Sequence, residues 1–141
     1  MIEIKMLGPT DTHLLDRVAD DVFDDPIVKS PAQEFLSDPR HRLVVALDED
    51  VVIGFVSAVI YLHPDKPAPE LWINEIGVAP THQRQGIGKR LLQAILEHAK
   101  QAGCIEAWVL TERDNMPAMA MYRSIGAEET LPDPVMFTFR L

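Results

Sequence analysis

The sequence predicts a single α/β domain in which helices flank a mixed β-sheet. Segments rich in β-branched residues alternate with segments whose apolar residues recur at helical spacing, which indicates strands and helices in one chain. The 141 residues suffice for one core, and no linker or repeat divides them. With 47% hydrophobic and 25% charged residues, the composition is that of an ordinary globular protein. We therefore expect one domain over residues 1–141.

Turn residues and apolar spacing place the expected elements along the chain. We expect strands at residues 2–6, 43–47, 51–62, 71–78, 104–111 and 135–141. Helices are expected from Thr10, with Leu14, Leu15, Val18, Ala19 and Val22 as the apolar face, and at 30–38, 87–102 and 115–125. The complete fold is expected to have a mixed sheet of six to seven strands, with about four helices on its two faces.

The stretch from Leu71 to Lys100 carries the most chemical information. An expected strand ends at Val78, and two glycines, Gly86 and Gly88, stand at the mouth of the following helix. Glycines allow backbone N–H groups to approach a ligand closely, and the first helical turn has unpaired donors and a partial positive charge. The cations of this corner are Arg84, Lys89 and Arg90. Such a corner suits a pyrophosphate.

Two common phosphate-binding motifs do not fit this corner. The loop of nucleoside-triphosphate-binding proteins requires a glycine where the chain has Gln83, and a serine or threonine where it has Arg90. The dinucleotide-binding fingerprint requires a third glycine at the position of Leu91. Neither motif therefore accounts for the two glycines.

The pattern Gln83-x-x-Gly86-x-Gly88, with the strand 73–78 before it, resembles the acetyl-CoA loop of the GCN5-related N-acetyltransferase (GNAT) family. The likeness extends along the whole chain and is closest to the type I aminoglycoside 3-N-acetyltransferases. It is also carried by Val22-Phe23-Asp24-Asp25, a strand pair ending near Tyr61-Leu62, Glu75, the run from His82 to Ile87, and Pro117-Ala118 ahead of Tyr122. The resemblance implies the GNAT fold and acetyl-CoA as co-substrate, bound where the fourth and fifth strands part.

The same resemblance implies a role for individual residues. The backbone of the fourth strand at Ile76, Gly77 and Val78 is implied to hold the pantetheine arm of acetyl-CoA. The residues implied to form its diphosphate loop are Gln83, Arg84, Gln85, Gly86, Ile87, Gly88 and Lys89. Asn115 is implied to contact the pantetheine arm, and Tyr122 to protonate the departing sulfur. The alternative is that Asn115 is a helix cap and Tyr122 a phenol that anchors the helix.

Carboxylates are the expected partners of the acceptor amine. Glu75 lies within an otherwise apolar strand, where the 3-N-acetyltransferases carry a carboxylate, and it is the candidate base; the alternative is a charge on the rim of the sheet. Asp24 and Asp25 belong to an acidic cluster that is a candidate binding site for a cationic substrate. Residues 1–50 hold 12 acids and 5 Lys or Arg, which is −7 of the total charge of −9. This excess indicates either solubility or an electrostatic funnel for a polycation.

Several classes of partner are disfavoured by composition. The net charge of −9 argues against nucleic acid, whose phosphates require a cationic surface. No apolar run approaches the ~18 residues of a membrane span and no leader pattern begins the chain, so a cytoplasmic location is expected. The single Cys104 and the spacing of the histidines predict no metal site. Dimerisation is common in similar proteins, although no residue of this chain demonstrates a homodimer.

The expected function is the transfer of an acetyl group from acetyl-CoA to a primary amine. The acceptor is expected to be a cationic small molecule such as an aminoglycoside. Two alternatives stay open at this point. One is an acetyltransferase for a protein Lys or an N-terminal amine, and the other is a sensor that binds acyl-CoA without turnover.

Overall fold

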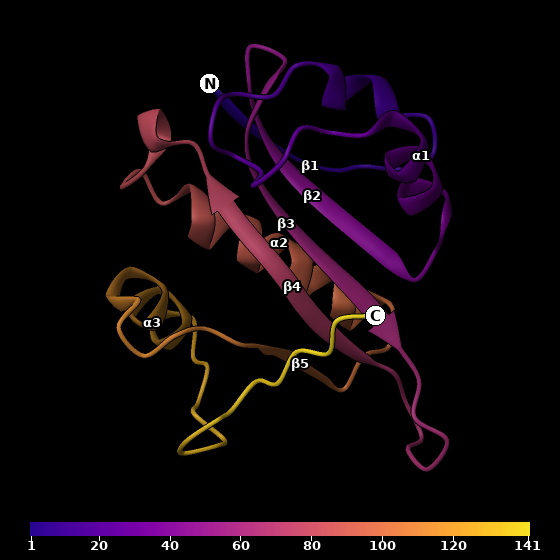
Figure 1. Ribbon diagram of the computed structural model, residues 1–141, viewed down its shortest axis with the longest axis vertical. Coiled ribbons are helices and arrows are strands. Elements are labelled where there is room, and N and C mark those ends of the chain that lie inside the picture. Colours follow the sequence, from indigo (N-terminus) through magenta and orange to yellow (C-terminus); the bar gives the residue numbers. More distant parts are fainter. The chain divides into compact units, whose positions relative to one another are not determined.

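The computed structural model describes all residues from Met1 to Leu141, and its contacts divide the chain into two compact units, Met1–Leu110 and Thr111–Leu141. The expectation of one domain therefore stays a prediction. The first unit contains a single five-stranded sheet (Figure 1). Its strands are β1 (Ile2–Met6), β2 (His41–Asp48), β3 (Val51–Tyr61), β4 (Glu70–Val78) and β5 (Glu106–Val109), in that spatial order. The first four pair antiparallel, and β5 runs parallel to β4.

Helix α2 (Ile87–Gln101) lies across one face of the sheet (Figure 1). Its apolar stripe is buried against the strands and consists of Ile87, Leu91, Leu92, Ile95 and Ala99. Gly54 of β3 makes this contact close, because a Cβ there would lie 3.2 Å from Leu91 Cδ1 and 3.5 Å from Ile87 Cγ2. The first turns of α2 therefore pack closely against β3. The sequence prediction for this helix is confirmed.

The opposite face of the sheet is crossed by the segment that follows β1. This segment contains the short 3₁₀ helix η1 (Thr12–Asp16) and ends in α1 (Lys29–Ser37). Phe23 stacks on Phe55 of β3 with ring centroids 4.0 Å apart. A Cβ on Gly77 of β4, the register partner of Phe55, would lie only 2.7 Å from the Val22 carbonyl oxygen. The chain around Val22 therefore passes directly over β4 at Gly77.

The helix predicted from Thr10 through Val22 is wrong beyond its first turn. Only η1 forms, because the backbone that follows pairs with the first residues of β3. The Val52 N–H donates to the Arg17 carbonyl at 2.9 Å, and the Ala19 N–H donates to the Val52 carbonyl at 2.9 Å. Val18 and Val52 thus form a parallel bridge that replaces helical hydrogen bonds.

The second unit contains one helix, α3 (Met116–Ser124), and no strand. The predicted strand at Val135–Leu141 is wrong, because these residues alternate in polarity but pair with no other strand. Their apolar side chains are exposed. The sheet accordingly has five strands, and the protein has three α-helices, instead of the six to seven strands and about four helices predicted. None of these helices combines the length and hydropathy that crossing a membrane requires.

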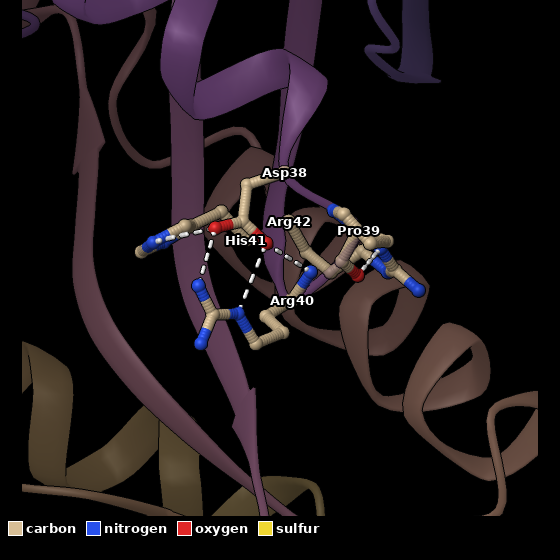
Figure 2. A network of polar contacts seen from close by, with 5 residues as sticks. All are labelled: Asp38, Pro39, Arg40, His41 and Arg42. Atoms are coloured by element: carbon tan, nitrogen blue, oxygen red, sulfur yellow. Dashed lines mark hydrogen bonds and ion pairs between the residues drawn. The ribbon is translucent and has the colours of Figure 1, made fainter.

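The turn from α1 into β2 is organised by one carboxylate, Asp38 (Figure 2). Its Oδ1 accepts from the Arg40 backbone N–H at 2.9 Å and from Arg40 Nε at 3.1 Å, and its Oδ2 accepts from Arg40 Nη2 at 2.8 Å. His41 Nε2 lies 4.0 Å from the same Oδ2. The hydrogen bonds from Arg40 hold the pKa of Asp38 well below its usual range. Asp38 and His41 therefore form an Asp–His pair at the start of β2.

Candidate functional site

Strands β4 and β5 pair at one end and part at the other. Residues Glu70–Ile73 pair with Glu106–Val109, and from Asn74 onward β4 has no partner on that side. The parting coincides with a bulge at Asn74, since Ser57 of β3 opposes Glu75 while the next residue, Ala58, opposes Ile73. A bulge bends the strand that carries it and ends regular pairing. The backbone of Ile76, Gly77 and Val78, predicted to hold pantetheine, lies on this unpaired stretch.

The paired end is held by an aromatic cluster around a buried carboxylate. Trp72 and Trp108 stack with centroids 5.5 Å apart, and the Trp108 indole N–H donates to the Tyr61 hydroxyl. Tyr61 donates in turn to Glu70 Oε1 at 3.2 Å, and His63 Nε2 lies 3.1 Å from Glu70 Oε2. Burial raises the pKa of the Tyr61 phenol. These contacts fix β4 and β5 at their paired end, and no pattern in the sequence predicted them.

The loop between β4 and α2 exposes a run of unpaired backbone donors. After η2 (Pro80–His82), no backbone N–H from Gln83 to Lys89 donates a hydrogen bond to another protein group. The first bond of α2 is from the Arg90 N–H to the Gly86 carbonyl at 3.1 Å. No side chain caps this helix, and a Cβ placed on Gly86 would meet nothing within 4 Å. The start of α2 at Gly86 is therefore open on the side that a Cβ would occupy.

The backbone conformation of this loop favours binding of an anion. Arg84 has φ +62° and Gly86 has φ +75°, so left-handed residues alternate with others. Such alternation turns successive N–H groups toward one point, and the positive end of the α2 dipole adds to their field. The side chains of Arg84, Gln85 and Lys89 are exposed beside them. The loop fits the diphosphate predicted for it.

Two side chains of the loop bind protein groups instead of facing solvent freely. Gln83 donates from Nε2 to the Val78 carbonyl at 3.2 Å, which ties the loop to the end of β4. Arg90, expected to add charge to the phosphate corner, donates from Nη2 to the Ile2 carbonyl of β1 at 3.2 Å. Arg84 and Lys89 are therefore the cations left for a ligand.

Glu75 lies on the face of β4 that carries Gly77, two residues further along the strand. Its side chain is exposed to solvent. The chain around Val22 crosses Gly77 on this same face and leads into the acidic cluster. Asp24 and Asp25 line a hollow of about 560 Å³ together with other carboxylates of the segment after β1. Glu75 does not line this hollow, so the structure does not bring the three candidate carboxylates into one pocket.

The second unit holds the remaining candidates, Asn115 and Tyr122. Asn115 precedes α3, and its Oδ1 accepts from the Ala118 N–H at 3.3 Å, so the alternative reading of Asn115 as a helix cap is confirmed. Pro117 lies in the first turn and has no N–H to satisfy. Tyr122 is the buried residue of α3, and burial raises the pKa of its phenol. A phenol with a raised pKa stays protonated at neutral pH, as a proton donor must.

His82 begins the run that carries the family resemblance, and the spacing of the histidines predicted no metal site. In the structure His82 contacts Asp48, a residue 34 positions away. No three His, Cys, Asp or Glu side chains come together in a group that could hold a metal ion. The absence of a metal stays a prediction.

One protein-family model matches most of the chain. The model of the acetyltransferase (GNAT) family matches residues 11–127. The chain belongs to the GNAT family. This confirms the resemblance recognised in the loop from Gln83 to Gly88. The GNAT match also includes β4, α2 and α3, which carry most of the candidate site residues.

The curated relatives match this chain over only part of their own length. The chain is 35% identical over 105 residues to the N-alpha-acetyltransferase RimI of Mycobacterium tuberculosis, covering 74% of this chain and 63% of RimI. Across the first five curated relatives, the match spans between 22% and 63% of their length.

Solved GNAT structures superpose along the whole chain. An aminoglycoside acetyltransferase from an uncultured soil metagenomic sample, in complex with sisomicin, has a TM-score of 0.81 at 25% identity, covering 99% of this chain and 96% of that one. The aminoglycoside N-acetyltransferase AAC(6')-Iy, in complex with CoA, has a TM-score of 0.75 at 22% identity, covering 99% and 95%. The second likeness establishes the fold alone.

Proposed function

We propose that this GNAT protein transfers an acetyl group from acetyl-CoA to a primary amine of a cationic small molecule. The observation that carries the proposal is the run of unpaired backbone N–H groups from Gln83 to Lys89 at the start of α2. An uncapped helix start that faces open space favours an anionic ligand. Membership of the acetyltransferase (GNAT) family supports acetyl-CoA as this ligand.

The residues proposed to bind acetyl-CoA divide into two groups. The loop amides, with Arg84 and Lys89, bind the diphosphate through charge-assisted hydrogen bonds. The unpaired backbone of Ile76 and Val78 offers strand-like hydrogen bonds to the pantetheine arm, and one N–H there polarises the thioester carbonyl. Acetyl-CoA supplies an activated acyl group with a thiolate as leaving group. Asn115, whose side-chain oxygen caps α3, has an amide NH₂ left to offer the pantetheine arm.

The reaction removes two protons from the amine nitrogen, one before attack and one as the amide forms, and supplies one proton to the departing sulfur. An alkylamine with a pKa of about 10.4 must lose a proton before it can attack, which costs roughly 4–5 kcal/mol at pH 7. Glu75, directly or through a water, is the proposed acceptor of that proton. The amine nitrogen then forms a bond to the acyl carbon while the carbon–sulfur bond breaks. Tyr122 is the proposed donor of the proton that the departing sulfur takes up. The nitrogen loses a second proton as the amide forms, and return of this proton to the phenolate, through solvent, restores Tyr122.

The acidic hollow favours a cationic acceptor. Asp24 and Asp25 line it, and a polycation gains attraction from several carboxylates at once. A structural relative bound to sisomicin supports an aminoglycoside as the acceptor class. The likeness to type I 3-N-acetyltransferases implies the 3-amino group as the acceptor atom. Analysis of the product by NMR distinguishes this amine from the 6'-amine.

Calorimetry and an acceptor screen test the proposal in sequence. CoA is titrated into the protein first, and we expect saturable binding that 3',5'-ADP, which retains a phosphate-rich end, partly reproduces. Aminoglycosides, polyamines and peptides with a free N-terminus are then compared by CoA release. Preference for peptides would favour the kind of acceptor that the name of RimI specifies. Binding of CoA without turnover of any acceptor would contradict the enzymatic proposal.

A further inference from the structure

His82 forms a three-residue contact at the entrance to the CoA loop. Its Nε2 lies 2.8 Å from Asp48 Oδ2, and its Nδ1 lies 2.8 Å from the Thr81 hydroxyl. A carboxylate only accepts hydrogen bonds, so Nε2 carries the proton and donates a hydrogen bond to Asp48. In the neutral ring, Nδ1 then accepts from Thr81. The histidine is therefore satisfied on both sides and held in one orientation.

Both partners of this contact are fixed to the sheet. Asp48 is the last residue of β2, with register partners Ile2 on β1 and Val51 on β3. On the other side, the His82 N–H donates to the Ala79 carbonyl at 2.9 Å, and the Ala79 N–H donates to the Ile53 carbonyl at 2.8 Å. The imidazole thus joins two rigid parts of the fold across 34 residues of sequence.

Apart from the His82 contact, the loop that follows this residue has one side-chain anchor before α2, the bond from Gln83 Nε2 to the Val78 carbonyl at 3.2 Å. The backbone N–H groups of the loop from Gln83 to Lys89 donate to no protein group. Beyond them, Arg90 donates to the carbonyl of Ile2, which is the register partner of Asp48. Both ends of the loop therefore contact one register pair of the sheet, Ile2 and Asp48. His82 contacts Asp48, and Arg90 contacts Ile2.

We propose that His82, held by Asp48, is a positioning residue that sets the geometry of the CoA loop. This inference rests on the proposed function, because it concerns the affinity of that loop for CoA. Donors that must converge on one diphosphate bind it tightly only when their spacing is set beforehand. With the His82 contact broken, the loop has to be ordered by the ligand, and part of the binding free energy is lost.

Two substitutions of His82 separate its two contacts. Glutamine places an N–H near the position of Nε2 and keeps the bond to Asp48, whereas asparagine places its polar atoms near Nδ1 and loses that bond. We expect His82→Asn to weaken CoA binding roughly 5- to 20-fold, the range for one partly exposed hydrogen bond to a charged group. His82→Gln is expected to bind CoA within about twofold of the unmodified protein.

The kinetic signature distinguishes positioning from a general loss of stability. The KM for acetyl-CoA is expected to rise in His82→Asn and in Asp48→Ala, while kcat at saturating acetyl-CoA stays within about twofold. Because both changes break one contact, the double variant is expected to bind CoA no more weakly than either single one.

A matched control lies at the other end of β2. Asp38 and His41 form a similar pair, with Asp38 Oδ2 4.0 Å from His41 Nε2 (Figure 2). Strand β2 has eight residues from His41 to Asp48, so its seven rises of about 3.3 Å separate the pairs by roughly 23 Å. Asp38→Ala is expected to leave CoA affinity unchanged. A loss of CoA affinity in Asp38→Ala equal to that in Asp48→Ala would overturn the proposal.

CoA binding by the unmodified protein distinguishes failure of the positioning role from failure of the proposed function. If it binds CoA and His82→Asn binds equally well while keeping its melting temperature, the positioning role is refuted and the proposed function stands. If the unmodified protein does not bind CoA, the proposed function and this inference fall together. Additive losses in the double variant would also overturn the proposal, since they would mean that the two residues act separately.

Discussion

The two helices α2 and α3 begin in opposite ways. Helix α2 starts at Gly86 with no side-chain cap, and the N–H groups before it have no protein partner. Helix α3 starts at Asn115, whose side chain accepts from the Ala118 N–H, and Pro117 removes another donor. One helix start is left open for an anion, while the other is satisfied by its own residues.

This difference assigns distinct contributions to the two helices. The unsatisfied donors of α2 make its backbone the proposed ligand-binding element, supported by nearby cations. Helix α3 has little backbone to offer, so its proposed contribution is a side chain, the phenol of Tyr122. Substitutions that change backbone conformation should therefore affect α2 most, and side-chain substitutions should affect α3 most.

The largest effect is expected for the side chain of α3. Tyr122→Phe should lower kcat by about 10²–10⁴, the range for loss of a general acid, with CoA affinity unchanged. Because burial raises the pKa of Tyr122, the phenol stays protonated through neutral pH. The rate of the unmodified protein should fall only above pH ~10, and the variant should lack that decline.

The other tyrosine provides the control for this prediction. Burial also raises the pKa of Tyr61, which lies in the aromatic cluster at the paired end of β4 and β5. We expect Tyr61→Phe to change stability and leave kcat unaltered. Equal kcat losses in the two variants, measured by CoA release across pH 6–11, would refute the acid role of Tyr122.

The next effect concerns the cations beside the open helix start. Arg84→Gly combined with Lys89→Ala should weaken CoA binding about 10²-fold, near the lower end of ~1.5–3 kcal/mol per charged hydrogen bond because both side chains are exposed. Glycine is chosen because Arg84 has φ +62°, so the backbone conformation is kept without strain. Calorimetry measures the affinity. Lys100→Ala, in the last turn of α2, should bind CoA normally; an equal loss there would mean that net charge alone is responsible.

A smaller effect is expected from strain in the loop. Valine at Gly86 (φ +75°) disfavours the left-handed conformation by roughly 1–2 kcal/mol, so CoA affinity should fall about tenfold. Gly103→Val places the same side chain at φ +84° beyond the far end of α2. That variant should lose similar thermal stability and keep its CoA affinity. If Gly86→Val binds CoA as tightly as Gly103→Val does, the loop conformation is not required for binding.

The smallest effect tests whether Asn115 does more than cap α3. Asn115→Ala should cost about 1 kcal/mol of stability through loss of the cap. Aspartate retains the accepting oxygen, so Asn115→Asp should keep this stability. If the amide also contacts pantetheine, Asn115→Asp should still weaken CoA binding, by about fivefold for one neutral hydrogen bond. Unchanged affinity measured by calorimetry would leave Asn115 as a cap only.

The sequence predicted the parts of the molecule that depend on local chemistry. The glycine spacing and apolar stripe located the loop and α2, and Asn115 with Pro117 located the start of α3. These signals act within a few residues. The Glu75 strand was equally clear from its apolar neighbours, although the bulge at Asn74 that accompanies the parting of β4 from β5 was not.

The sequence could not predict features that depend on distant partners. Five apolar residues at helical spacing suggested a helix through Val22, but pairing of Val18 with Val52 took its backbone hydrogen bonds. The alternating pattern of Val135–Leu141 specifies a strand-like face and says nothing about a neighbour to pair with. The His82–Asp48 contact spans 34 residues and has no spacing rule that would reveal it.

The most direct test of the central claim observes the loop amides themselves. In a ¹⁵N-labelled protein titrated with CoA, the amide resonances from Gln83 to Lys89 should shift more than any other group. The Ala118 amide, already bound to Asn115, should shift little in comparison. Saturable binding of CoA that leaves the Gln83–Lys89 amides unperturbed would contradict the account, because the diphosphate would then be bound elsewhere.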